Sequence, residues 1–137
     1  MNEKRVTIDE EKVYTEPFDL EGESKQFAFR VIKVYQYLTE QAQKKEYNMS
    51  KMLLLKGTSI GDLVRQKDHL GAFNAASSAK YWIEMETNGG YLSEAQSQQL
   101  LDDCIRLVRY LYVIVHPESR KAKESQPRKS KTDTQTF

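Results

Sequence analysis

The sequence of 137 residues has one cysteine, few prolines and no long apolar segment. Its single Cys104 cannot close an internal disulfide. The longest uninterrupted apolar run, Leu111 to Val115, is far shorter than the roughly 20 residues that cross a bilayer. The N-terminus, Met-Asn-Glu-Lys-Arg, is not followed by the apolar stretch of a signal peptide. These absences predict a cytoplasmic protein that has no membrane partner.

Proline is also absent between Phe18 and His116, and four segments in that stretch repeat apolar residues with the period of an α-helix. Asn48 or Ser50 is the expected start of the second helix, and Gly89-Gly90 the expected end of the third. Gln96 completes a capping box with Ser93. The four helices are expected at about residues 24–45, from 48 or 50 through 64, at 67–88 and from 93 to just before Pro117.

Short connections between four helices predict an all-α, antiparallel up-and-down four-helix bundle. We place this single domain at residues 23–117. Residues 1–22 are expected to form an extended or disordered N-terminal arm, and residues 118–137 a disordered basic C-terminal tail with almost nothing to bury.

Residues 57–61 read Gly-Thr-Ser-Ile-Gly and fit the G-x-S-x-G pattern of a serine hydrolase. In that class a strand delivers the serine onto a strained turn beside a histidine. Here the preceding residues are leucine-rich and helical, and neither histidine, His69 or His116, has a convincing acidic partner. We therefore expect no catalytic residue and no enzymatic activity.

Two glycines four residues apart lie on one face of a helix, where they cost about 1 kcal/mol each relative to alanine. Such a face leaves a groove that admits another backbone or a large ring, and Tyr81 or Trp82 on the third helix is a plausible occupant. The sequence thus predicts a helix-packing motif made of Gly57, Thr58, Ser59, Gly61, Tyr81 and Trp82.

Several stretches together resemble one protein family. They are "FAFRVIKVYQYL", "MSKMLLLKGTSIG", "YWIE", "GGYLS" and "LLDDCIRLVRYL", and the resemblance covers about residues 24 to 116. The family is that of bacterial four-helix-bundle proteins, with members encoded in intervening sequences of large-subunit ribosomal RNA genes. A related set comprises the accessory variability proteins of diversity-generating retroelements.

The resemblance implies the bundle fold, a ring of five subunits and no known catalysis. The retroelement proteins imply nucleic acid, RNA or DNA, and a reverse transcriptase as partners. This chain departs from the family pattern because only nineteen residues separate Gly61 from Tyr81, about three helical turns fewer than usual. The shortening puts the pentamer in question.

Charge is unevenly distributed along the chain. Residues 25–67 carry nine basic and three acidic side chains, whereas residues 68–116 carry three and six. Such asymmetry indicates either a nucleic-acid partner or an electrostatically matched contact between head-to-tail copies. In a ring, exposed tyrosines such as Tyr37, Tyr110 and Tyr112 would supply most of the interface energy.

The candidate nucleic-acid-binding residues are basic side chains of the first two helices and the tail. They are Arg30, Lys33, Lys51, Lys56, Arg65, Lys67, Arg120, Lys121, Lys123, Arg128, Lys129 and Lys131. Two interpretations stay open: an accessory factor that tracks a phosphate backbone, or a protein-interaction or scaffold module whose lysines are only a solvated surface.

Other reactive side chains point to structural roles. Neither histidine belongs to the Glu-x-x-His pair of a carboxylate-bridged metal site, so no metal and no cofactor is expected. Cys104 falls on an apolar helix stripe, where a thiol behaves as a small hydrophobe. Asp102 and Asp103 are expected on a solvated face.

Overall fold

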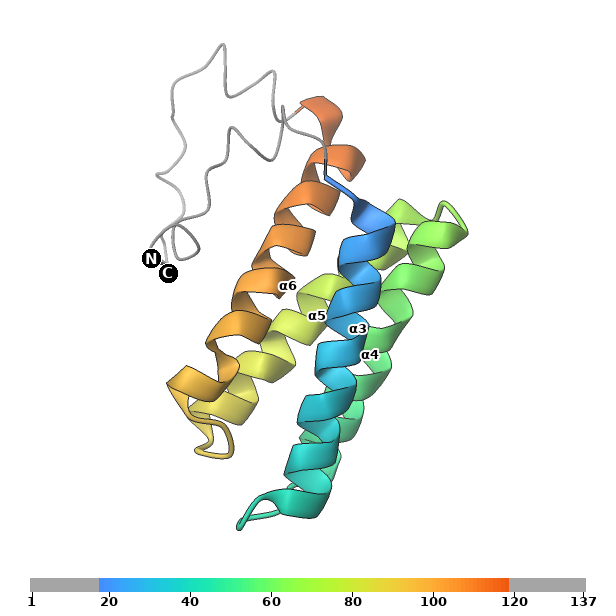
Figure 1. The fold of residues 1–137 in the computed structure, drawn as a ribbon. Coiled ribbons are helices and arrows are strands. Elements are labelled where there is room, and N and C mark those ends of the chain that lie inside the picture. The colour runs from blue at the N-terminus through green and yellow to red at the C-terminus, as the bar shows by residue number, and fades with distance from the viewer. Residues whose placement is uncertain (1–17, 119–137) are drawn as a thin grey trace, which may run out of the picture.

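The computed structural model describes residues 18–118, and the regular secondary structure of that part of the chain is entirely helical (Figure 1). Four helices run along one another as a bundle, which confirms the expected fold class. They are α3 (Leu20–Gln36), α4 (Asn48–Arg65), α5 (His69–Asn88) and α6 (Glu94–Val115), and a short π-helix, η1 (Tyr37–Gln41), extends α3. The expected basic tail and most of the N-terminal arm lie outside the described residues.

The first helix begins earlier than expected. Asp19 accepts a hydrogen bond from the backbone N–H of Gly22 at 3.0 Å, so it caps α3 in the manner of an N-cap aspartate. The helix therefore includes Leu20, which the sequence assigned to the arm. After the π-turn, Ala42 adopts an extended conformation, so the helix ends at Gln41, four residues before the expected limit at Lys45.

The remaining helix boundaries follow local capping chemistry. Asp68 caps α5 through the N–H of Gly71, and Ser93 and Gln96 form the expected capping box at the start of α6. Gly89 ends α5 and Gly90 adopts φ of +86°, a conformation in which a side chain would be strained. The predicted glycine stop and the predicted start of α6 are both confirmed.

The core lies along the centre of the bundle and takes side chains from all four helices. Its fully buried members include Phe27, Leu53, Ile83 and Leu107. Alanines of α5 at positions 72, 75, 76 and 79 are buried as well, which lets neighbouring helices approach this helix closely. No helix within the described range is long and apolar enough to span a membrane.

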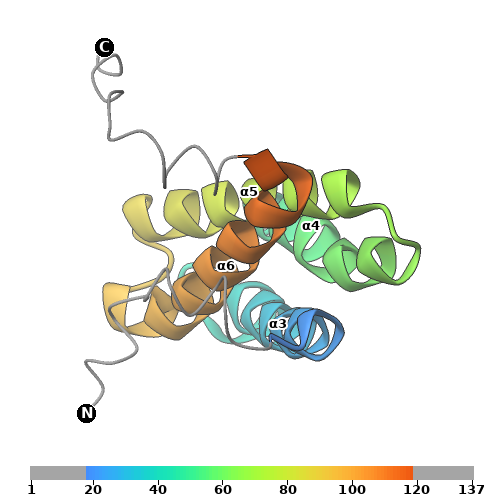
Figure 2. The ribbon, with the colours of Figure 1, turned by 90° about the horizontal axis from the view of Figure 1, so that it is seen from above.

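The four helices are not equally close to one another. Neighbours in sequence pack side by side, whereas α6 approaches α3 less closely, so the bundle is closed more loosely between its first and last helices (Figures 1 and 2). Both ends of the described segment, the start of α3 and the end of α6, lie at the same end of the bundle (Figure 1).

Candidate nucleic-acid interface

The glycines of the Gly-Thr-Ser-Ile-Gly segment face α3. A Cβ atom placed on Gly57 would lie 2.8 Å from Cγ2 of Val31, and one placed on Gly61 would lie 3.3 Å from Oγ of Ser24. Gly57, Val31 and Ser24 are all buried. The two glycines are therefore a helix-packing device, as predicted, and they let α4 approach α3.

The predicted occupant of the glycine groove was wrong. Tyr81 is 51% exposed on α5 and packs edge-on against its neighbour Trp82 at 4.9 Å, while Trp82 is half-buried against the core. The prediction failed because glycines show only that something comes close, and the first helix, with small Val31 and Ser24, fills the space that a ring would need.

The two hydroxyls of the motif are bonded within their own helix. Oγ1 of Thr58 donates to the carbonyl of Leu54 at 2.7 Å, and Oγ of Ser59 donates to the carbonyl of Lys56 at 3.0 Å. Ser59 lies in the middle of α4, with no strand before it in the described chain. The segment consequently lacks the strand-to-helix turn that presents a nucleophilic serine.

A cavity of about 530 Å³ opens beside this motif, between the start of α3 and the end of α4. Its lining combines small and charged side chains. The lining residues are Asp19, Glu21, Gly22, Ser24, Lys25, Ala28, Thr58, Gly61, Asp62 and Arg65. Neither a histidine nor Ser59 lines it, so the cavity does not assemble the groups of a hydrolase site.

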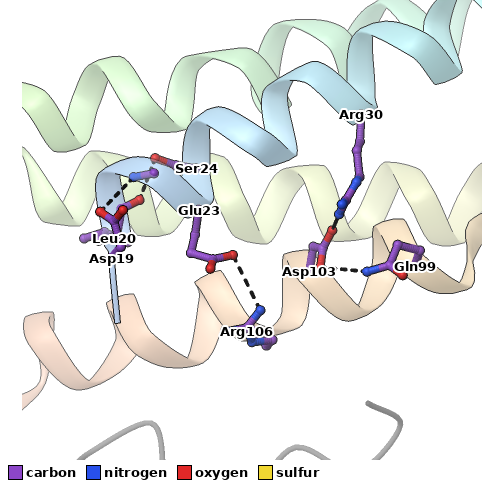
Figure 3. A network of polar contacts seen from close by, with 9 residues as sticks. Asp19, Leu20, Glu23, Ser24, Arg30, Gln99, Asp103 and Arg106 are labelled. Carbon is purple, nitrogen blue, oxygen red and sulfur yellow. Dashed lines mark hydrogen bonds and ion pairs between the residues drawn. The ribbon is translucent and has the colours of Figure 1, made fainter. Parts of the chain in front are cut away.

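Two of the six candidate basic side chains in the described part of the chain form ion pairs with aspartates of the same chain. Arg30 forms an ion pair with Asp103 of α6 (Figure 3), and Arg65 pairs with Asp62 one turn earlier in α4. The Asp103 side chain is only 13% exposed, so Arg30 serves the contact between α3 and α6. Because its guanidinium is paired with Asp103, Arg30 is not retained as a candidate phosphate-binding residue.

The other four candidates lie at the surface: Lys33, Lys51, Lys56 and Lys67. The side-chain ammonium of none of the four forms an ion pair or hydrogen bond with another described residue. Lys51 and Lys56 are five residues apart on α4, a rotation of about 140°, so they point to different sides of the helix. The lysines form a broad positive surface rather than one basic face.

Lys67 is placed by backbone geometry. It adopts φ of +65° in the turn between α4 and α5, where its N–H donates to the carbonyl of Val64 at 2.9 Å. A left-handed residue is uncommon outside glycine and asparagine, and it turns the chain sharply after the helix. The remaining candidates, Arg120, Lys121, Lys123, Arg128, Lys129 and Lys131, lie outside the described residues.

The expectation of a solvated face at Asp102 and Asp103 was wrong. Asp102 is 8% exposed, and one of its oxygens, Oδ2, is buried without a hydrogen-bond partner among the described residues. Asp103 faces Arg30 across the gap between α3 and α6, and the amide of Gln99 also donates to it at 3.2 Å. The helical period of the sequence could not predict the burial of Asp102 or the pairing of Asp103. Polar residues at the boundary between two helices fall at the same positions of the period as polar residues exposed to solvent.

Sequence reasoning missed a pair of buried glutamates, Glu46 and Glu86. Glu86 is fully buried on the same stripe of α5 as Ala79 and Ile83. Glu86 follows Ala79 and Ile83 by seven and three positions, and this helical spacing could have identified it as a buried residue. Glu46 precedes α4 and is 7% exposed.

The surface charge of the second half of the chain is smaller than its sequence suggests. Of the six acidic residues in positions 68–116, Glu86 and Asp102 are buried and Asp103 pairs inward. The tyrosines proposed for an interface are also partly used within the chain. Tyr110 packs on Phe18 at 4.6 Å, and Tyr112 stacks on His116 at 4.3 Å.

Cys104 is buried, as predicted, and its thiol contacts the carbonyl oxygen of Ala76 at 3.3 Å. Burial raises the pKa of this thiol to about 12, with a smaller opposing effect from Lys80, so the thiolate is not formed at neutral pH. Within residues 18–118 no three potential metal-ligating side chains come together.

Comparison with known proteins supports the fold. No family model and no curated protein matches the sequence. Among solved structures, the chain is similar to a protein of unknown function from the S23 ribosomal protein family of Bacteroides thetaiotaomicron. The two share 26% identity with a TM-score of 0.65, over 70% of this chain and 97% of that one. The match extends over nearly the whole of a protein about the size of this bundle.

Proposed function

We propose that this chain is a non-catalytic cytoplasmic bundle protein that binds nucleic acid through the lysines of its first two helices. The observation that carries the proposal is a set of four surface lysines, of which Lys33, Lys51 and Lys67 are exposed and Lys56 is partly exposed. Their ammonium groups have no acidic partner among residues 18–118, while the acidic side chains of the second half are largely buried or paired. Unpaired lysines release counterions when they meet phosphates, which is the main source of sequence-independent affinity.

The turn between α3 and α4 adds an aromatic group to this surface. Tyr47 is 58% exposed there. It follows Lys44 by three positions in the same turn, and the ammonium of Lys44 lies 4.8 Å from the ring centre of Tyr91. An exposed ring beside positive charge can stack on an unpaired base, so a single-stranded ligand suits this end of the molecule. We propose RNA as the ligand because its loops, bulges and ends offer unpaired bases.

A binding measurement tests the proposal. Fluorescence anisotropy with labelled single-stranded RNA should show affinity that falls steeply between 50 and 200 mM salt. Lys51→Gln should weaken binding, whereas the matched control Lys80→Gln should not, because Lys80 is already paired with Glu84 at 2.9 Å. Truncation at Ser119, which removes the basic tail, should weaken binding further.

No binding to RNA or DNA at physiological salt would favour the alternative of a protein-interaction or scaffold module. A specific observation supports that alternative. Leu70 and Tyr81 are 58% and 51% exposed and lie on the same side of α5, since eleven residues correspond to about 20° of net rotation. Two large, exposed hydrophobic side chains on one side of a helix are better suited to contact another protein than to contact a phosphate backbone.

We also propose membership of the bundle family encoded in ribosomal RNA intervening sequences, with self-association into a pentamer and a reverse transcriptase as a further partner. The sequence motifs that resemble this family, such as "MSKMLLLKGTSIG" and "GGYLS", support the proposed membership. The electrostatic argument for a head-to-tail ring is weaker than the sequence suggested, because Asp103 and Glu86 do not present charge to a neighbour. Exposed Leu55, Leu70 and Tyr81 would have to supply the interface. Light scattering at low and high salt distinguishes a pentamer from a monomer.

A further inference from the structure

The end of the bundle that holds the α3–α4 turn contains a buried carboxylate that caps a helix. The two side-chain oxygens of Glu46 accept hydrogen bonds from the N–H groups of Met49 and Ser50, each at 2.7 Å. Oγ of Ser50 donates back to the Glu46 carbonyl at 2.8 Å. Glu46 therefore satisfies backbone donors in the first turn of α4, a position that favours its ionised form.

Glu86 reaches this cap from the last turn of α5. Its backbone carbonyl accepts the N–H groups of Tyr91 at 2.9 Å and Leu92 at 3.2 Å, which fixes the turn into α6. Its side chain is fully buried, and neither carboxyl oxygen has a hydrogen-bond donor among the described residues. The group that its carboxyl meets is the carboxylate of Glu46.

Two buried carboxylates in contact cannot both be ionised without strong repulsion. A proton on Glu86 removes the repulsion and provides the missing donor, because its O–H can bond to Glu46. Burial and the neighbouring Glu46 raise the pKa of Glu86 to about 8. Burial opposes ionisation of Glu46 as well, but the hydrogen bonds from Glu86 and from the backbone of Met49 and Ser50 lower its pKa below 4.5 overall.

Other charges at this end are used elsewhere. Lys44 lies over the ring of Tyr91, and Nζ of Lys45 donates to the carbonyl of Ala42 at 3.0 Å. Glu94 at the start of α6 is exposed, and Glu84 of α5 is paired with Lys80. Glu46 is the charged group that acts on Glu86.

We propose that the Glu46–Glu86 contact is a proton-dependent lock, in which a proton held by Glu86 joins the α3–α4 turn to the end of α5. Loss of that proton in mildly alkaline solution places two negative charges in the same buried space and loosens this end of the bundle. The turn that loosens is the one that carries Lys44, Lys45 and Tyr47.

The direction of the pH effect follows from proton linkage. The folded chain keeps a proton on Glu86 that the unfolded chain releases near pH 4.5. The contribution of Glu86 to stability is therefore full below pH 4.5, declines as the pH rises, and is lost once the pH passes about 8. Glu46 acts in the opposite sense, since its lowered pKa makes its contribution complete above pH 4.5 and weaker in acid.

Glu86→Gln tests the lock because the amide keeps a donor for Glu46 and cannot ionise. From pH 6 to pH 8, Glu86 alone should lower the wild-type folding equilibrium constant about fiftyfold, with a decline of nearly tenfold from pH 6 to 7 and a smaller one as the pH approaches 8. Denaturant unfolding of Glu86→Gln should lack that decline, whereas the control Glu84→Gln, on the same helix but partly exposed, should retain it. Hydrogen-exchange protection of Met49 and Ser50 should fall in the wild type over the same range.

A titration of the wild-type chain keeps the proposal testable even if Glu86→Gln fails to fold. Carbon-13 NMR of the Glu86 carboxyl should show its midpoint well above that of an ordinary glutamate. A midpoint near 4.5, or an equal pH dependence in the wild type and Glu86→Gln, would overturn the proposal. Neither result depends on whether the chain binds RNA.

Discussion

The helix α3 meets its two neighbours by different chemistry. Against α4 it places Val31 and Ser24 over two glycines, with no ion pair between these helices among the described residues. Against α6 it places Arg30 on Asp103, and Glu23 lies 3.5 Å from Arg106 (Figure 3). One side of the helix is closely packed and apolar, and the other is polar and less close.

The difference indicates which contact sets stability and which sets alignment. Close apolar packing gains dispersion and burial at every atom pair, but it tolerates no added volume. Partly exposed ion pairs are worth about 0 to 1 kcal/mol each, yet they are satisfied at only one register of the two helices. We infer that the α3–α4 contact holds the bundle together and that the α3–α6 contact orients the last helix.

The largest effect is expected from Gly57→Leu. Its side chain would enter the space of Val31, which is fully buried and, being β-branched, cannot rotate away. Overpacking of this kind costs about 1 to 3 kcal/mol, and we expect the upper part of that range. Denaturant unfolding measures the loss, and an unchanged midpoint would contradict the close α3–α4 packing.

Alanine at the two glycines provides a matched pair. Gly57→Ala should destabilise, because its Cβ would lie 2.8 Å from Val31. Gly61→Ala should be close to neutral, since its Cβ would meet Ser24 at 3.3 Å and alanine favours the helix by about 1 kcal/mol. Equal losses at the two positions would show that the closer approach of Val31 to Gly57 has no effect on stability, and would contradict the packing argument.

A smaller effect is expected on the α6 side. Arg30→Met should cost about 1 kcal/mol, mostly because the largely buried Asp103 loses its partner. A double-mutant cycle with Asp103→Asn should give a coupling of less than about 1 kcal/mol that weakens in high salt. A coupling as large as the Gly57→Leu loss would reverse the ranking of the two contacts.

The sequence was sufficient for the elements that depend on local chemistry. The capping box at Ser93, the glycine stop at Gly89-Gly90 and the apolar stripe of α6 all act within a few residues, so their patterns predict them. It was insufficient where the partner comes from a distant segment. Val31 packs on Gly57 from another helix. The periodicity of each helix shows which face is apolar, but it does not give the register of one helix against the other.

The candidate site shows the same limit. The positive charge of residues 25–67 could be predicted from the sequence, but the ion pair that engages the candidate Arg30 joins it to Asp103, 73 positions away. The buried Glu86 was read as part of the acidic half, although its place among alanines on α5 gave a hint of burial. A count of charges along the sequence does not show which charged side chains are exposed, because burial and pairing depend on how the helices pack.

The smallest effect is expected from Ser59→Ala, within the same motif but on another side of α4. Its hydroxyl bonds only to the carbonyl of Lys56, and two residues of helix rotate it about 200° away from Gly57 and the α3 contact. Alanine removes that local bond but is the better helix former by about 0.5 kcal/mol, so the two terms nearly cancel. We expect a stability change within about 0.5 kcal/mol by denaturant unfolding and no loss of RNA binding by anisotropy. Esterase turnover that disappears in Ser59→Ala would instead make the serine a nucleophile, and the motif more than a packing device.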